Sequence, residues 1–177
     1  DPGFALAHVQ LGLTNGTLYW FGFLDPTPAR RERVRQAMEA ASRLAPDLPE
    51  TRLARGGFLY LSENDWAGAL AEFKAAELGM PNDAQVAFYI GLAQRRLGQL
   101  PQAITSIRRA TELNPRDQPS AAALMESLNA QRQFAEARRL ALGYDARFGR
   151  APDNLRFLAS YELELDGDRE KYFRATA

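Results

Sequence analysis

The sequence predicts an all-α fold, in which about five helical hairpins, the last one incomplete, stack into a right-handed α-α superhelix, or solenoid. Prolines mark the period, because Pro46, Pro81 and Pro115 stand 35 and 34 residues apart. Each interval holds two amphipathic helical patterns. In the clearest unit, residues 84–115, a short break at residues 98–100 separates them. Since a single hairpin cannot bury both of its faces, the units are expected to stack on one another.

Composition places the chain among ordinary globular proteins. Its 177 residues, 46% hydrophobic and 25% charged, suit one continuous solenoid domain. A formal net charge of zero argues against a nucleic-acid partner, which would call for an excess of basic residues. The absence of cysteine excludes disulfides and thiolate metal sites. No apolar run reaches the length of a membrane span, so no membrane partner is predicted. The compartment stays unknown, with the cytoplasm favoured over the periplasm.

The first unit, residues 1–46, is longer than the others by about ten residues. We expect its first helix to extend over residues 4–21 and a loop to follow through the next residues. Thr27 is expected to cap the second helix, with Pro28 in the first turn, where a missing N–H costs nothing. That helix is predicted to end at about Leu44.

The second and third units, residues 47–81 and 82–115, share a glycine, two alanines and a large apolar residue. We equate Gly57 with Gly91 as the small residues that let the two helices of a hairpin approach closely. Phe73 is expected to fill the space between successive hairpins. The matched positions are Gly57, Ala69, Phe73 and Ala76 in the second unit, and Gly91, Ala103, Ile107 and Ala110 in the third.

The last two units depart from this pattern. In the fourth, residues 116–152, Met125 replaces the glycine, and the second helix is predicted to be longer by about a turn. The fifth, residues 153–177, supplies one helix and the start of another. Both ends of the predicted stack lack a polar capping helix. We therefore expect either a fragment of a longer chain or ends that another copy covers, which would give a homo-oligomer.

This order of residues resembles the tetratricopeptide repeat (TPR) family, whose helix-turn-helix unit has a period of about 34 residues. Leu53, Tyr60 and Trp66 add to the match in the second unit, whereas Gln94 replaces the aromatic residue in the third. The resemblance implies a non-catalytic module that binds a protein or peptide in its concave groove. Chaperone-tail binding is not implied, because Val9 and Leu13 stand where such relatives have Lys and Asn.

A second resemblance concerns the first two units, which look like TPR regions attached to bacterial regulatory proteins. Of the basic residues only Lys74 and Lys171 are lysine, and this arginine bias also indicates a bacterial genome. The alternative function is therefore self-association, or an autoregulatory scaffold within a larger signalling or transcription-regulatory protein.

The family resemblance also implies which residues line the groove, because the first helix of each hairpin faces the concave side. Aromatic residues beside arginines would suit a peptide with apolar anchors and a carboxylate. The alternative for Phe58 and Phe88 is packing against a neighbouring helix. The predicted groove residues are Arg55, Phe58, Phe88, Tyr89, Leu92, Arg95 and Arg96.

Aromatic residues gather in the insertion of the first unit, at Tyr19, Trp20, Phe21 and Phe23. They predict either a docking patch or local packing against the first hairpin. The chain has a single histidine, His8, which has no suitable partner for metal binding or catalysis. Neither Gly-rich phosphate-binding motif occurs. We therefore predict no catalytic residue, no metal site and no cofactor.

Overall fold

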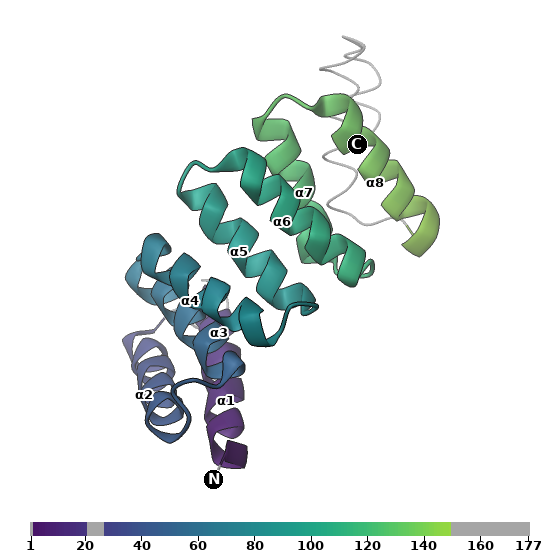
Figure 1. Cartoon of the computed structure of the whole chain (residues 1–177). Helices are drawn as coiled ribbons and strands as arrows, with labels where there is room; N and C mark the ends of the chain where they lie inside the picture. The colour runs from purple at the N-terminus through teal and green to yellow at the C-terminus, as the bar shows by residue number, and fades with distance from the viewer. Residues whose placement is uncertain (1, 21–26, 150–177) are drawn as a thin grey trace.

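The computed structural model describes residues 2–20 and 27–149, which form eight α-helices and one π-helical turn. Successive helices pair into hairpins that stack from the N-terminal end of the chain to α8 (Figure 1). The predicted all-α solenoid is confirmed. The elements are α1 (Pro2–Trp20), α2 (Pro28–Leu44), α3 (Pro49–Phe58), the π-helical turn η1 (Leu59–Glu63), α4 (Trp66–Gly79), α5 (Ala84–Arg96), α6 (Leu100–Leu113), α7 (Gln118–Ala130) and α8 (Phe134–Phe148).

The second helix begins where the sequence predicts. The Thr27 hydroxyl accepts a hydrogen bond from the backbone N–H of Arg30 at 3.3 Å, and Pro28 occupies the first turn of α2. A side-chain cap of this kind satisfies one of the N–H groups that a helix start leaves without an internal partner. The predicted end at Leu44 is also confirmed.

A close contact between a glycine and a large side chain joins the two helices in three of the hairpins. A Cβ atom added to the glycine would lie within 2.5 Å of that side chain, closer than real Cβ contacts. The pairs are Gly12 with Met38 (1.8 Å), Gly56 with Phe73 (2.5 Å) and Gly91 with Ile107 (2.4 Å). In the fourth hairpin the sizes are exchanged, since Met125 stands at the glycine position and Ala141 at the large one, both within one buried cluster.

The predicted role of Gly57 is wrong by one residue. Gly56 makes the contact within the hairpin, whereas Gly57 faces the Leu13 side chain of α1, 3.7 Å from the position of an added Cβ. The cause is η1, a wider turn that takes up one residue more than the third hairpin needs. It ends at Asn64, whose φ of 56° lies in the left-handed region. The first helices of these two hairpins are therefore 35 residues apart, and their second helices 34.

Two predictions concern the C-terminal part of the chain: the length of the last described helix, which is wrong, and the fifth unit, which the structure does not describe. The helix α8 has 15 residues against 14 in α6, so it is longer by one residue and not by a turn. The predicted fifth unit, residues 153–177, lies outside the described residues. Phe73 and Ile107 are fully buried, as expected for residues that fill the stack.

Thr51 carries a buried hydroxyl that has no hydrogen-bond partner among the described residues. Its equivalent in the third hairpin, 35 residues further on, is the buried Val86. A desolvated polar atom without a partner costs about 1–3 kcal/mol. We therefore expect Thr51→Val to raise the free energy of unfolding by about 1 kcal/mol, measured as a higher urea midpoint.

The matched control is Thr111→Val, which removes a hydroxyl that donates to the carbonyl of Arg108 at 2.7 Å. This variant should gain no stability, because a satisfied hydrogen bond is lost. Equal or lower stability of Thr51→Val would show that its hydroxyl is solvated or bonded in solution.

Candidate groove site

A groove of about 440 Å³ lies along the first helices of successive hairpins, from η1 across α5 to α7. The helix α5 lies in the middle of the described stack (Figure 1). It forms the floor of the groove, since it supplies seven of the lining residues. Five of the seven predicted groove residues line it. They are Phe88, Tyr89, Leu92, Arg95 and Arg96.

The middle of the groove is apolar and is anchored in the core. Phe88 and Tyr89 meet with ring centroids 5.7 Å apart, and Tyr89 stacks on the buried Phe73 at 5.2 Å. Leu92 is half-buried and packs against the cores on both sides of α5. Both alternatives considered for Phe88 therefore hold, because it lines the groove and also packs against the neighbouring hairpin. Side chains held in this way present a preformed surface.

One end of the groove carries two arginines. Arg95 donates to a carboxylate oxygen of Glu126 on α7 at 2.8 Å. The Nε of Arg96 donates to the Tyr60 hydroxyl at 3.3 Å, and its guanidinium lies 5.8 Å from the centre of the Trp66 ring. Contacts from the preceding hairpin thus orient Arg96 and hold its positive charge at this end of the groove.

The other end of the groove is polar, with Gln85, Asn114 and Asp117 among its lining residues. The carboxylate of Asp117 caps α7, accepting hydrogen bonds from the backbone N–H and the hydroxyl of Ser120 at 3.0 and 2.5 Å. The charges along the groove are therefore asymmetric: two guanidinium groups outweigh the Glu126 carboxylate at one end, and the Asp117 carboxylate lies at the other.

Tyr89 stays uncharged in this setting. Burial raises the pKa of its phenol above the ordinary value of about 10, and the nearby Tyr60 phenol raises it further. At neutral pH the middle of the groove therefore holds no phenolate that would repel an acidic ligand.

Arg55 and Phe58 lie elsewhere, in a second and more open depression of about 750 Å³ between α2 and the α3–η1 segment. The one-residue register error explains the misplacement. At a spacing of 35 residues, they correspond to Ile90 and Ala93, which face the preceding hairpin. The structure therefore does not bring these two residues together with the other five.

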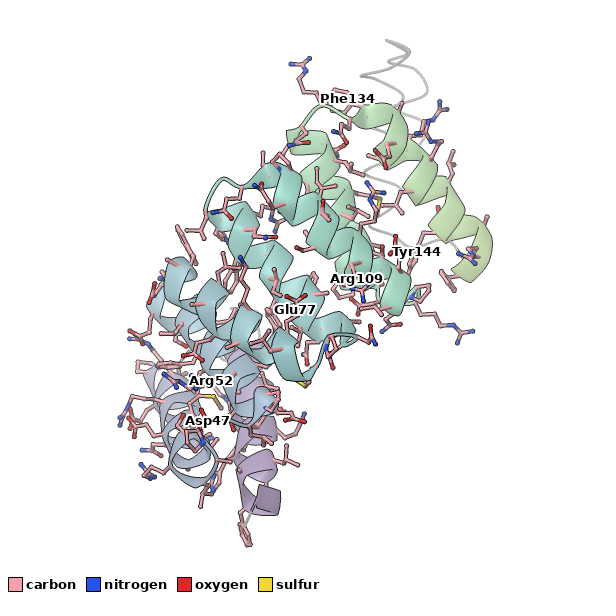
Figure 2. All side chains as sticks on the ribbon, in the orientation of Figure 1. Asp47, Arg52, Glu77, Arg109, Phe134 and Tyr144 are labelled. Carbon is pink, nitrogen blue, oxygen red and sulfur yellow. The ribbon has the colours of Figure 1, made fainter. Side chains whose placement is uncertain are left out.

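Arg55 belongs to a charged cluster that links α3 to α4. A guanidinium nitrogen of Arg55 lies 3.1 Å from one carboxylate oxygen of Glu72. The other carboxylate oxygen of Glu72 lies 3.4 Å from a nitrogen of Arg52. Arg52 and Asp47 lie close together (Figure 2), with 2.7 Å between nitrogen and oxygen. The hydrogen bonds to Asp47 and Glu72 raise the pKa of Arg52. These contacts indicate a structural role for the cluster.

Ten of the fifteen lining residues were not predicted from the sequence, and Leu61 and Glu126 are two of them. Leu61 enters the groove through η1, which no sequence pattern revealed. Glu126 follows Met125, the residue in the glycine position of the fourth hairpin, so the rule that selected Leu92 would have selected it. Met125 was predicted at the glycine position, but groove residues were predicted only for the second and third units.

Other predicted features lie partly or wholly outside the described structure. The side chains of Tyr19 and Trp20, and all of Phe21 and Phe23, are outside the described residues. Within the described parts of the chain, no group of three or more His, Cys, Asp or Glu residues is placed to hold a metal ion. None of the described helices combines the length and the apolarity that a membrane crossing requires.

No protein-family model matches this chain, and no curated protein matches it. Solved structures do match. PilW, described as a widely conserved type IV pilus biogenesis factor, is 19% identical with a TM-score of 0.77, over 99% of this chain and 76% of that one. YrrB, described as a TPR protein with an unusual peptide-binding site, is 18% identical with a TM-score of 0.66, over 83% and 75%. TTC0263, a thermophilic TPR protein of Thermus thermophilus, is 19% identical with a TM-score of 0.68, over 97% and 87%.

These likenesses show that the chain has the fold of TPR solenoids. At this level of identity they show the fold alone. The predicted resemblance to repeat regions of bacterial regulatory proteins stays a prediction.

Proposed function

We propose that this chain is a non-catalytic binding module that holds a segment of another protein in the groove formed by η1, α5 and α7. The observation that carries the proposal is the apolar floor of Phe88, Tyr89 and Leu92, which ends at Arg95 and Arg96. The volume of about 440 Å³ falls in the range of roughly 300–1,000 Å³ that ligand sites occupy. The likeness to YrrB, a TPR protein with a peptide-binding site, supports it.

The chemistry of the groove favours a ligand that has an apolar side chain and a carboxylate at a fixed distance from each other. An apolar side chain fits the floor, because burying it there removes the exposed parts of Phe88 and Leu92 from water. A carboxylate fits the arginine end, since hydrogen bonds between guanidinium and carboxylate groups are stronger than those between neutral partners. The carboxylate of Asp117 disfavours a second acidic group at the opposite end. We therefore propose an extended segment with an apolar anchor and an acidic group about one helical turn along the groove.

A library of random 12-residue peptides displayed on phage provides the probe. Enriched peptides, synthesised with a fluorescent label, would be titrated by anisotropy against the wild type and two variants, Arg96→Glu and Phe88→Ala. We expect enriched sequences to contain an apolar residue with Asp or Glu close to it in the sequence, on the same side in most of the enriched peptides. Affinity should fall at least tenfold in either variant, because each removes one of the two recognition features.

The controls place the same kinds of change outside the groove. Arg139→Glu alters an exposed arginine of α8, and Leu78→Ala alters a leucine of α4 that is 89% exposed. Both should leave the affinity unchanged, and circular dichroism verifies that every variant is folded. Peptides that bind all variants equally would place the site elsewhere, and a library without enrichment would count against peptide binding.

A further inference from the structure

The first helix presents an apolar face that nothing in the described structure covers. Across its 19 residues α1 contains no Asp, Glu, Lys or Arg. Phe4 is 65% exposed and Leu11 is 52% exposed, although both side chains are fully apolar. A surface helix normally turns charged or polar residues to water and its apolar residues to the core, whereas α1 exposes Phe4 and Leu11. The exposed face of α1 therefore has the chemistry of a contact surface.

The internal symmetry of the stack identifies which surface this is. Gly12 and Gly91 hold the same place in their hairpins and are 79 residues apart. At that spacing Ala7, Leu11 and Thr14 of α1 correspond to Val86, Ile90 and Ala93 of α5. On α5 these three residues are at most 4% exposed and belong to the same buried cluster as Phe73 of α4. The exposed face of α1 thus continues the interface that joins successive hairpins.

The residues along this face alternate in size. Phe4, Ala7, Leu11 and Thr14 lie on one side of α1, all are exposed, and large residues alternate with small ones. The four positions are also symmetric about position 9. If a second α1 packs antiparallel with its twofold axis at that point, Phe4 faces Thr14 of the other copy and Ala7 faces Leu11. Every contact then pairs a large side chain with a small one, whereas a parallel arrangement would oppose Phe4 to Phe4.

We propose that two copies of this chain associate through α1, antiparallel and related by a twofold axis, with Phe4, Ala7, Leu11 and Thr14 at the interface. A twofold interface brings a surface against itself, so a face that carried charge of one sign would repel its own copy. An uncharged face avoids that repulsion, and the size pattern supplies the complementarity. Because one helix face is smaller than a standard interface of about 800 Å² per partner, the dimer is expected to be reversible and to depend on concentration.

Sedimentation velocity between about 2 and 200 µM tests the association. The wild type should shift from monomer to dimer within this range. Leu11→Glu should weaken the dimer at least tenfold, because it brings a carboxylate into the uncharged interface. Leu78→Glu is the matched control, since it introduces the same charge at an exposed leucine of α4, and it should dimerise like the wild type. A wild type that stays monomeric at 200 µM overturns the proposal, and so does equal weakening by the two variants.

Cysteine cross-linking tests the antiparallel arrangement, and the cysteine-free chain makes it clean. In the proposed dimer, the two copies of residue 4 are ten helical positions apart, or about 15 Å. A disulfide needs Cα atoms within about 7 Å. Neither Phe4→Cys nor Thr14→Cys should therefore form a covalent dimer alone, but an equimolar mixture should under mild oxidation. Cross-linking of Phe4→Cys alone, or none in the mixture at a concentration where the wild type dimerises, contradicts this geometry.

Discussion

Replacing Phe73 with alanine is expected to lower the free energy of unfolding by about 3–5 kcal/mol. The Phe73 ring is completely buried between the second and third hairpins and lies against Gly56. Its stacking on Tyr89 would also be lost. Since Gly56 has no side chain, nothing from the facing helix can fill the cavity, so the cost should fall toward the upper end of the range. The melting temperature should drop by roughly 10 °C.

Urea denaturation of two further variants separates volume from stacking. Phe73→Ile copies the residue that Ile107 provides in the next hairpin, so it should lose less than half as much stability as Phe73→Ala. Leu78→Ala shortens an exposed leucine on the same helix and should change stability by less than about 0.5 kcal/mol. A Phe73→Ala loss below about 1 kcal/mol would mean that the two hairpins collapse together without this ring.

Phe73 also links the core to the proposed groove. Because its ring supports Tyr89, the alanine variant should allow the groove floor to shift even under conditions in which the protein remains folded. Peptides selected on the wild type should then bind Phe73→Ala more weakly than Phe73→Ile. Equal affinities for the two variants would indicate that the floor holds its position without support from beneath.

The repeat period and the start of α2 were predictable because each rests on local chemistry. Proline at the end of a hairpin and threonine before Pro28 act through their own backbone geometry and capping, which a sequence displays directly. The positions on α5 that line the groove were predictable for a related reason, whereas their role in binding stays a prediction. The third unit contains no insertion, so a family rule counted from Gly91 reaches Phe88 and Leu92 without error.

The same rule failed in the second unit because two adjacent glycines satisfied it equally. Choosing Gly57 over Gly56 shifted the register by one residue, which on a helix turns a side chain by about 100°. Arg55 and Phe58 were thereby assigned to the groove, although they line the depression between α2 and the α3–η1 segment. Only packing distinguishes the two glycines, since Gly56 lies against Phe73 while Gly57 faces α1. The interval of 35 residues between Pro46 and Pro81 shows that an extra residue is present, but it does not show that η1 contains it.

Glu126 shows the complementary difficulty. Its place in the groove follows from Met125, which the sequence does place at the glycine position, but the rule for groove residues was applied only to the second and third units. The exchange becomes visible only when both partners are compared, because Ala141 is small where Phe73 and Ile107 are large. A sequence motif specifies a residue type at each position separately, whereas packing depends on the summed volume of the two side chains that face each other.

The second large effect is expected when the pair of residues from the fourth hairpin, methionine and alanine, is placed at positions 91 and 107 of the third hairpin. Gly91→Met alone should destabilise by about 1–3 kcal/mol through overpacking, because an added Cβ would lie 2.4 Å from Cγ1 of Ile107. Methionine gains up to about 1 kcal/mol over glycine in helix propensity, but this gain is smaller than the clash. Ile107→Ala alone should cost about 2–5 kcal/mol through the cavity that it leaves.

Combined, Gly91→Met and Ile107→Ala should lose less stability than the sum of the two single losses, by about 1–3 kcal/mol. The recovery should be partial, because an added Cβ would also lie 3.1 Å from the Ala103 carbonyl oxygen, which a smaller side chain at position 107 does not move. Urea denaturation of all four proteins gives the coupling energy. Pairing Gly91→Met with Met38→Ala, the large residue of a different hairpin, should give strictly additive losses. If the first combination is additive too, the volume exchange seen between Met125 and Ala141 does not act within a hairpin, and the glycine must be required by the close approach of the α5 and α6 backbones.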